Sequence, residues 1–186
     1  MKTLVLLGSR DPAGRTARSA AAFLAGAVEA GSEEETILLP EMTLERCRQC
    51  ENSGWGECKD QGSCVIEDDF AALVDRIASA DVVAFATPVY FGDLSESMRA
   101  FLDRLRRVCM HDAGRARIQD KAAVGICMAG GSGGGTPACA VSLDKVLSRC
   151  GFDLADMVLV RRQNIDLKLD VLRATGRWIA AYAAGQ

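Results

Sequence analysis

The sequence is poor in histidine, in long apolar runs and in excess charge, and each scarcity excludes a class of protein. His111 is the only histidine among 186 residues, so a metal centre built on histidines is excluded. No apolar stretch approaches the roughly 20 residues that a membrane-spanning helix needs, and we expect no membrane partner. The formal net charge is only −3, so the chain has no electrostatic reason to bind nucleic acid.

Signals of secretion are lacking as well. The chain begins with one lysine and a short apolar run, which leads directly into Gly8 and Ser9 without a cleavage-type segment. Eight cysteines without an export signal indicate a reducing compartment, where paired disulfides are disfavoured. We therefore expect a cytoplasmic protein whose thiols stay reduced.

Five apolar runs of strand length alternate with five helix-like segments. The runs are nearly continuous in hydrophobicity, which is typical of strands covered on both faces of a parallel sheet. The alternation predicts an α/β three-layer sandwich, with residues 1–186 in a single domain that ends in a helix. The predicted strands are 3–7, 36–39, 82–86, 122–128 and 157–160, and the predicted helices are 16–30, 69–80, 95–108, 136–150 and 171–184.

A cysteine-rich loop at about 44–66, here called the cysteine segment, breaks this alternation. It holds Cys47, Cys50, Cys58 and Cys64 within 18 consecutive residues. A long irregular loop inside a compact domain is more often functional than accidental. Reduced thiols are soft ligands, so the segment predicts an iron–sulfur or zinc site, and free or redox-active thiols are the alternative.

The loop after the first strand, residues 8–16, suits a phosphate group. Its glycines let the backbone approach an anion, and the amides at the start of the following helix point towards it. The loop is neither a Walker motif nor a dinucleotide fingerprint, because it lacks their lysine and glycine patterns. The alternative is a plain helix cap by Ser9 or Thr16.

The loops after the third and fourth strands suit a flat ring. Tyr90 and Phe91 lie between Pro88 and Gly92, where aromatic faces and exposed amides could hold a planar heterocycle. The alternative is that both rings cover the core or a dimer contact. Residues 130–135, here called the glycine loop, contain five glycines, which predicts a lid, a wall against a planar ligand, or a merely flexible loop.

The remaining cysteines and the arginine clusters are given structural roles. The other four cysteines lie in helix or strand patterns and are expected to be small buried hydrophobic residues: Cys109, Cys127, Cys139 and Cys150. The arginines at positions 104, 106 and 107 are expected to form a solvated helix face. Arg161 and Arg162 are expected on the surface, with the phosphate of a nicotinamide dinucleotide as an alternative partner.

Taken together, these motifs resemble the NADPH-dependent FMN reductase group of flavodoxin-like proteins, particularly its iron–sulfur flavoprotein branch. The resemblance covers almost the whole chain, and it is carried by residues 8–16, the four clustered cysteines with residues 65–70, residues 87–92 with 101–104, and the glycine loop. It implies a five-stranded parallel sheet of order 2-1-3-4-5, an FMN cofactor and a homodimer or homotetramer.

The resemblance also implies an FMN site on three loops. The first loop would hold the phosphate, the loop after the third strand would run along the isoalloxazine ring, and the glycine loop would close the other side. The family often has an arginine and an asparagine where this chain has Asp11 and Arg15, so Arg10 or Arg15 would supply the countercharge. The implied FMN contacts are Ser9, Arg10, Gly14, Arg15, Thr16, Ala17, Pro88, Val89, Tyr90, Phe91, Gly92, Ala129, Gly130, Gly131 and Gly133.

The cysteine spacing departs from that of the iron–sulfur branch, which reads Cys-x2-Cys-x2-Cys before the fourth cysteine. Here seven residues separate Cys50 from Cys58. An insertion of that size costs little free energy and could bulge outward. Cys47, Cys50, Cys58 and Cys64 are therefore candidate ligands of a [4Fe–4S] cluster, and zinc and free thiols stay open.

The expected function is that of an FMN-binding oxidoreductase. It would pass electrons from NAD(P)H or a reduced carrier to a small-molecule acceptor such as a quinone or free flavin. One alternative is a non-enzymatic carrier that takes electrons from reduced ferredoxin, and another is a thiol-based metal or redox sensor. Because the flavin carries the chemistry, no catalytic side chain is expected.

Overall fold

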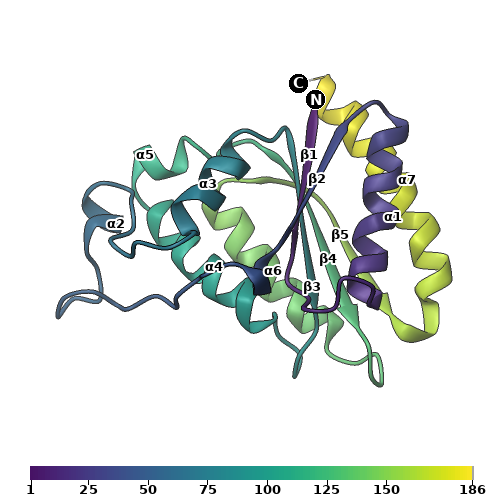
Figure 1. The fold of residues 1–186 in the computed structure, drawn as a ribbon, viewed down its shortest axis with the longest axis horizontal. Helices are drawn as coiled ribbons and strands as arrows, with labels where there is room; N and C mark the ends of the chain where they lie inside the picture. The colour runs from purple at the N-terminus through teal and green to yellow at the C-terminus, as the bar shows by residue number, and fades with distance from the viewer. Residues whose placement is uncertain (186) are drawn as a thin grey trace.

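A five-stranded parallel sheet lies between two layers of helices in the computed structural model, which describes residues 1–185 (Figure 1). The strand order is β2-β1-β3-β4-β5, and every neighbouring pair is parallel. The predicted fold class and strand order are therefore confirmed. The strands are β1 (Lys2–Leu7), β2 (Glu33–Leu38), β3 (Val82–Pro88), β4 (Ala122–Ala129) and β5 (Asp153–Arg161).

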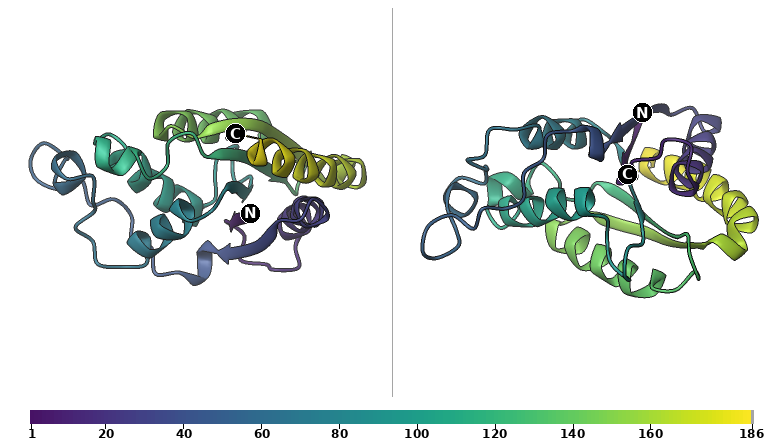
Figure 2. Two further views of the ribbon diagram at one scale, coloured as in Figure 1. Left: turned by 90° about the horizontal axis from the view of Figure 1, so that it is seen from above. Right: turned by 60° about the horizontal axis from the view of Figure 1, so that its bottom comes forward.

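Five long helices cover the two faces of the sheet (Figures 1 and 2). Helices α1 (Arg15–Glu29) and α7 (Ile165–Ala184) cover one face. Helices α3 (Phe70–Ala78), α4 (Glu96–Val108) and α6 (Thr136–Cys150) cover the other. Short helical turns interrupt the connections: η1 (Leu39–Glu41), α2 (Glu57–Asp60), α5 (Asp112–Arg115) and η2 (Arg162–Asn164). Within residues 1–185, no helix combines the length and apolar character needed to cross a membrane.

Alternate residues of the central strands enter the two cores. Leu4 and Leu6 of β1 pack with α3, α4 and α6, whereas Val5 and Leu7 pack with α1 and α7. Every residue of β3 and β4 is buried. This two-sided burial explains why the strands are nearly continuous apolar runs in the sequence.

Glycines bring α1 and α7 into backbone contact. A methyl group on Gly26 would lie 1.9 Å from the carbonyl oxygen of Arg173, and one on Gly176 would lie 2.0 Å from that of Phe23. Neither position can carry a larger side chain without moving the helices apart. The last helix is therefore packed tightly on the first.

Three elements begin earlier in the chain than predicted. Strand β2 begins at Glu33 rather than at residue 36, because Glu35 is neutralised by ion pairs with Lys2 and Arg76 on this edge of the sheet. Strand β5 begins four residues before the predicted start, and α7 begins six residues before it, at Ile165. Ile165 is buried against the α1 side of the sheet, so packing extends the helix beyond its clear periodic region.

Candidate functional site

The loops after β1, β3 and β4 start from one common edge of the sheet, at the bottom of Figure 1. The amide of Gly8 donates to the carbonyl of Ala86 at 2.8 Å, and the amide of Val89 donates to that of Met128 at 2.9 Å. These bonds continue the strand pairing into the loops. The three loops that were predicted to bind ligand are therefore neighbours.

The first loop leads directly into α1, so the N-terminus of this helix lies at the same edge of the sheet. Gly14 caps the helix without a side-chain hydrogen bond, and no acidic residue lies in the first turn. The Asp11 carboxylate accepts from the amide of Ala13 at 3.0 Å, which shapes the turn. The first amides of a helix have no partner inside it, and they carry the positive end of its dipole. The start of α1 is therefore an anion-binding position.

A cavity of about 410 Å³ lies in front of these amides. The Arg15 side chain reaches across it, since its Nη1 lies 3.8 Å from the point that a Cβ on Gly130 would occupy. The residues that line the cavity are Ser9, Asp11, Ala13, Gly14, Arg15, Thr16, Arg18, Pro88, Val89, Tyr90, Met128 and Gly130. Two arginines and a helix start therefore surround one polar space.

A second cavity of about 470 Å³ adjoins the first, because Val89 and Gly130 line both. Its other walls are residues 91–92 and residues 129–135. The wall is largely backbone, so a flat ligand could approach amides and carbonyls closely. The two adjoining spaces are called the double cavity below.

Two further contacts hold the glycine loop at the rim of the double cavity. The Gln163 side-chain amide donates to the carbonyl of Ser132 at 3.0 Å. A methyl group on Gly133 would lie 3.2 Å from Cδ of Arg161. In this structure the glycine loop is thus held as a wall against the end of β5, and Arg161 is placed at the rim.

A tight hairpin turn carries the two aromatic residues. The amide and carbonyl of Tyr90 exchange hydrogen bonds with those of Asp93, at 3.0 and 2.9 Å. Phe91 and Gly92 both have positive φ, at 51° and 80°, as in a type I′ turn. The Phe91 side chain is fully exposed at the tip, where it borders the second cavity.

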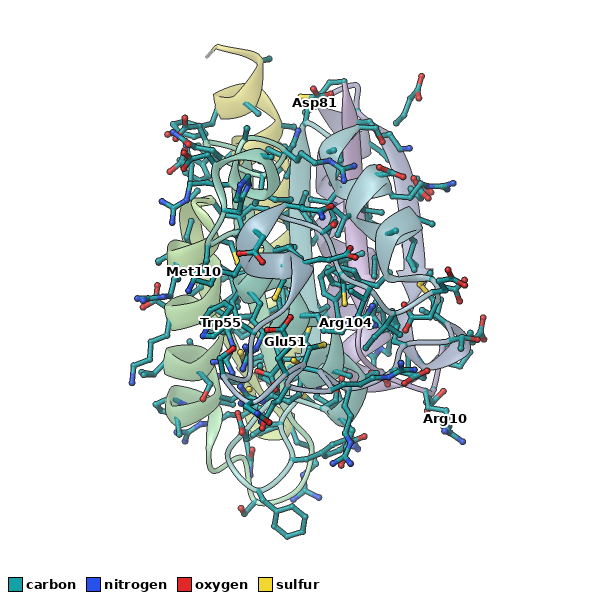
Figure 3. The ribbon with its side chains drawn as sticks, turned by 90° about the vertical axis from the view of Figure 1, so that its left-hand side faces the viewer. Arg10, Glu51, Trp55, Asp81, Arg104 and Met110 are labelled. Carbon is teal, nitrogen blue, oxygen red and sulfur yellow. The ribbon has the colours of Figure 1, made fainter. Side chains whose placement is uncertain are left out.

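All of the predicted FMN contacts except Arg10 and Ala17 line the double cavity. Arg10 lines a separate cavity of about 300 Å³ beside Ser95 and points outward at a corner of the molecule in Figure 3. Ala17 lies in α1 and is buried in the core between this helix and the sheet. Arg18 was missed, although its place one turn after Arg15 on the helix could have indicated it.

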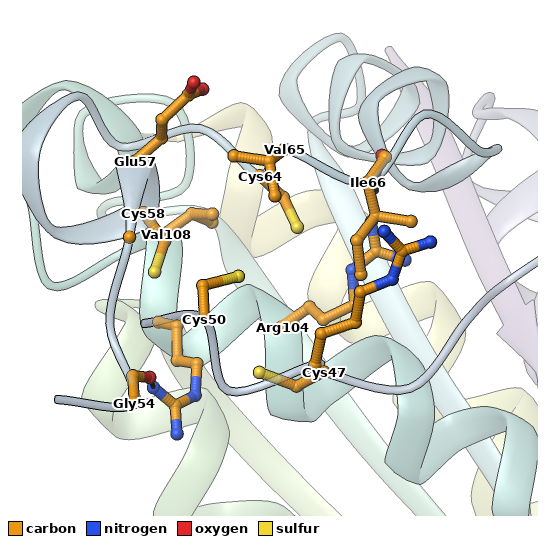
Figure 4. A pocket seen from close by; sticks show the side chains of 13 residues that line it. Cys47, Cys50, Gly54, Glu57, Cys58, Cys64, Val65, Ile66, Arg104 and Val108 are labelled. Atoms are coloured by element: carbon orange, nitrogen blue, oxygen red, sulfur yellow. Dashed lines mark hydrogen bonds between the residues drawn. The ribbon is translucent and has the colours of Figure 1, made fainter. Parts of the chain in front are cut away.

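The four clustered cysteines line one pocket, called the cysteine pocket, together with Arg48, Arg104 and Arg107 (Figure 4). Their sulfur atoms point towards the space between them. In the part of the chain that the structure describes, however, no group of three or more histidine, cysteine, aspartate or glutamate side chains is placed to hold a metal ion. The geometry therefore gives no direct support for a bound metal.

The long interval between Cys50 and Cys58 folds back on itself. A methyl group on Gly56 would lie 3.0 Å from Cβ of Cys50, so the chain returns to Cys50 before it reaches Cys58. Arg107 fixes the outer part, since its Nη1 donates to the carbonyl of Gly54 at 2.7 Å and its guanidinium lies 4.8 Å from the Trp55 ring centre. The extra residues therefore loop outward without separating the two cysteines.

Arg104 contradicts the prediction of a solvated arginine face. Its side chain is only 1% exposed, and both Nη atoms donate to the Asp68 carboxylate, at 2.6 and 2.9 Å. Its guanidinium also lies 4.2 Å from the centre of the Phe70 ring. The prediction was wrong because Asp68, far from Arg104 in sequence, supplies the buried countercharge. Arg106 is exposed as predicted and pairs with Asp103.

The other four cysteines are buried, which confirms their prediction. They form two contacts, Cys127 with Cys139 and Cys109 with Cys150. The hydrogen bond with Cys139 and then burial raise the pKa of the Cys127 thiol, and Cys109 and burial do the same for Cys150. Cys127 and Cys150 are therefore protonated and unreactive at neutral pH.

Comparison with known proteins agrees with this geometry. A curated iron–sulfur flavoprotein of Methanocaldococcus jannaschii is 31% identical over 131 residues, which are 70% of this chain and 65% of that protein. The chain thus spans less than two thirds of that relative's length. The solved NAD(P)H:quinone oxidoreductase from Methanothermobacter marburgensis has a TM-score of 0.70 at 20% identity, with 96% of each chain covered. An archaeal flavodoxin has a TM-score of 0.64 at 16% identity, with 99% of each chain covered.

The two solved structures show a common flavodoxin-like fold, and they are too distant in sequence to show more. A family model described as NADPH-dependent FMN reductase matches residues 1–163. This match confirms the resemblance drawn from the loop motifs. The chain therefore belongs to the NADPH-dependent FMN reductase family of flavodoxin-like oxidoreductases.

Proposed function

We propose that the double cavity binds FMN and that the protein transfers electrons from NAD(P)H to a small acceptor such as a quinone or a free flavin. The observation that carries the proposal is the joining of the two cavities. One end offers helix amides and arginines, which suit a phosphate, and the other offers a backbone wall, which suits a flat ring.

Each part of the chain has a defined task in this proposal. The first-turn amides of α1 and the Arg15 guanidinium neutralise the phosphate. Val89 and the turn after it lie along one edge of the ring, and the glycine loop excludes water from the other. FMN, when bound, supplies the hydride and electron chemistry, so no side chain needs to act as an acid or base.

We further propose that Cys47, Cys50, Cys58 and Cys64 hold a [4Fe–4S] cluster. The support is the gathering of four thiols and three arginines around one pocket, together with the similarity to an iron–sulfur flavoprotein of M. jannaschii. In such a cluster each thiolate binds a different iron, so the four sulfurs are spread further apart than around one zinc ion.

Protein purified without oxygen tests both cofactors. We expect flavin absorption bands, about one FMN per chain, broad iron–sulfur absorption and four irons per chain. Flavin without iron would show that no cluster is bound, and stoichiometric zinc would show that the four cysteines hold zinc instead. Absence of flavin after incubation with FMN would overturn the main proposal.

Turnover assays separate an enzyme from an electron carrier. We expect steady oxidation of NADPH or NADH when a quinone or free flavin is the acceptor. If purified protein oxidises neither nucleotide but is rapidly reduced by ferredoxin, the carrier function is correct instead. A flavin and a cluster in one chain, as proposed above, would favour that alternative.

A further inference from the structure

A third cavity, called the side cavity below, lies next to the double cavity and has no part in the proposed flavin site. It has a volume of about 300 Å³. Its walls come from the loops after β1 and β2, from Tyr90 and from the start of α4. Tyr90 lines the first part of the double cavity as well, so the two spaces adjoin at this residue. A molecule in the side cavity would therefore lie beside the proposed flavin.

The walls of the side cavity combine two kinds of side chain. The segment after β2 supplies an apolar surface of Leu39, Met42 and Leu44. The loop after β1 and the first turn of α4 supply polar groups, namely Arg10, Glu96 and Ser97. A space of this kind suits a ligand that has both a flat apolar ring and groups that donate and accept hydrogen bonds.

The two charged side chains of the side cavity are free to meet a ligand. Arg10 is exposed and turns outward at a corner of the molecule (Figure 3). Within residues 1–185, neither Arg10 nor Glu96 forms an ion pair. A guanidinium offers paired donors that match the oxygens of a phosphate, and a carboxylate accepts from hydroxyl groups. The rim of the side cavity can therefore bind both an anion and a hydroxyl donor.

The adenosine half of a nicotinamide dinucleotide has this chemistry. The faces of its adenine ring suit the apolar surface and the Tyr90 ring. In dinucleotide sites, an acidic side chain binds the ribose hydroxyls and an arginine accommodates the 2′-phosphate that distinguishes NADPH from NADH. The side cavity offers one of each. A quinone presents only acceptors, and it would leave the Glu96 carboxylate without a partner.

We propose that the side cavity binds the adenosine half of the nicotinamide dinucleotide and that Arg10 binds the 2′-phosphate of NADPH. This inference rests on the proposed oxidation of NAD(P)H at a flavin in the double cavity. The nicotinamide end then stays with the double cavity, and the link between the two halves passes Tyr90. Arg10 thereby selects NADPH over NADH and takes no part in binding FMN.

Calorimetric titration of the FMN-loaded protein tests the binding directly. The probes are adenosine 2′,5′-bisphosphate and adenosine 5′-monophosphate, which differ by the 2′-phosphate and cannot reduce a flavin. We expect Arg10→Gln to bind the bisphosphate about 10-fold more weakly than the wild type and the monophosphate equally well. Arg10→Lys should keep part of the preference. Arg149→Gln is the matched control, because it removes an exposed arginine at the far end of α6.

A second variant tests the position of the site. Ser97→Phe places a large ring in the side cavity and should weaken both adenosine compounds alike. Bound FMN and melting temperature are measured first for every variant. In turnover assays with a quinone as the acceptor, Arg10→Gln should raise KM for NADPH and leave KM for NADH and kcat unchanged.

The outcomes separate this inference from the proposed function. If the wild type binds both adenosine compounds equally, or if Arg10→Gln keeps the preference of the wild type, the inference is wrong. Unchanged binding in Ser97→Phe would also overturn it, because the ligand would lie elsewhere. If the wild type binds the bisphosphate through Arg10 but oxidises neither nucleotide, the binding site stands and the proposed function fails.

Discussion

Gly92 and Gly135 pack backbone against backbone. A Cβ on Gly135 would lie 2.7 Å from Cα of Gly92 and 3.1 Å from its amide nitrogen. This contact joins the aromatic turn to the glycine loop, and so it sets the width of the second cavity. Gly135 also has a φ of 82°, which other residues adopt only at a cost.

Gly135→Ala should therefore distort the double cavity. We expect a loss of about 2 kcal/mol in the free energy of unfolding, from backbone strain and the clash with Gly92. FMN affinity should fall as well, as measured by fluorescence titration of the apoprotein. Gly131→Ala is the matched control for the stability measurement, because no protein atom lies within 4 Å of its added methyl group. Equal behaviour of the two variants would show that the contact does not shape the site.

Arg15→Ala should weaken the binding of FMN much more than that of riboflavin, which lacks the phosphate. Loss of one charge-assisted hydrogen bond costs about 1.5–3 kcal/mol, or roughly 10- to 100-fold in affinity. Titration with both flavins measures the difference. Arg10→Ala should bind FMN normally, because Arg10 lines another cavity. A selective FMN defect in Arg10→Ala would reverse these assignments.

The buried Asp68–Arg104 pair should make stability depend on acid pH. Although burial alone raises the pKa of Asp68, hydrogen bonds from Arg104 and from the amides of Glu45 and Phe70 lower it overall. Asp68→Asn should reduce the free energy of unfolding by about 3 kcal/mol at pH 7. Because the folded pKa lies below the unfolded value of about 3.9, this contribution is present above that pH and is lost as the pH falls through the lowered pKa.

Urea unfolding at a series of pH values measures this dependence. The gap between wild type and Asp68→Asn should stay constant from pH 7 to about pH 5 and shrink below about pH 4. A gap that persists unchanged into acid would show that the pair's charge is not responsible.

Phe91 combines a left-handed backbone with a fully exposed ring, which is costly for an aromatic residue. Phe91→Asn should raise the free energy of unfolding by about 1 kcal/mol, since asparagine suits this position of a type I′ turn. NAD(P)H oxidation should slow at the same time, because the ring borders the second cavity. Phe91→Tyr keeps the ring and should change neither quantity. Unchanged turnover in Phe91→Asn would show that the ring has no functional role.

Thiol labelling should divide the eight cysteines into two sets. In folded protein stripped of metal, iodoacetamide should modify the half-buried set in the cysteine segment and spare the four cysteines that are fully buried. Reconstitution with iron and sulfide should protect the reactive set. Peptide mass spectrometry identifies the modified positions, and rapid labelling of Cys127 or Cys150 in folded protein would contradict the burial described above.

The sheet could be predicted because its central strands are nearly continuous apolar runs, as expected for strands covered on both faces. The start of β2 could not be predicted, because its first three residues are glutamates, which are not typical of a strand. The third of them, Glu35, is neutralised by ion pairs with Lys2 and Arg76. Helix α5 is a single turn whose place depends on a contact between Gly62 and Gly114 from distant parts of the chain. Contacts of this kind leave no local periodicity.

The candidate site, like the fold, could be predicted from the sequence only in part. The positions of the three loops follow from the order of strands, so residues such as Gly14 and Gly130 could be placed on the double cavity from their neighbours in sequence. The side to which Arg10 turns could not be foreseen, and neither could the burial of Arg104. Each depends on a partner or space supplied by another segment, which a single sequence does not display.

Helix α1 starts at the loop proposed to take up the phosphate, and its outer packing partner is α7, through Gly26 and Gly176. During synthesis, residues 165–184 leave the ribosome after all five strands. The part of this sheet face that α7 covers therefore stays exposed until after the five strands and α1 have been made. A chain cut before residue 165 would therefore lack the helix against which α1 packs, and the loop proposed to take up the phosphate would lose part of its support.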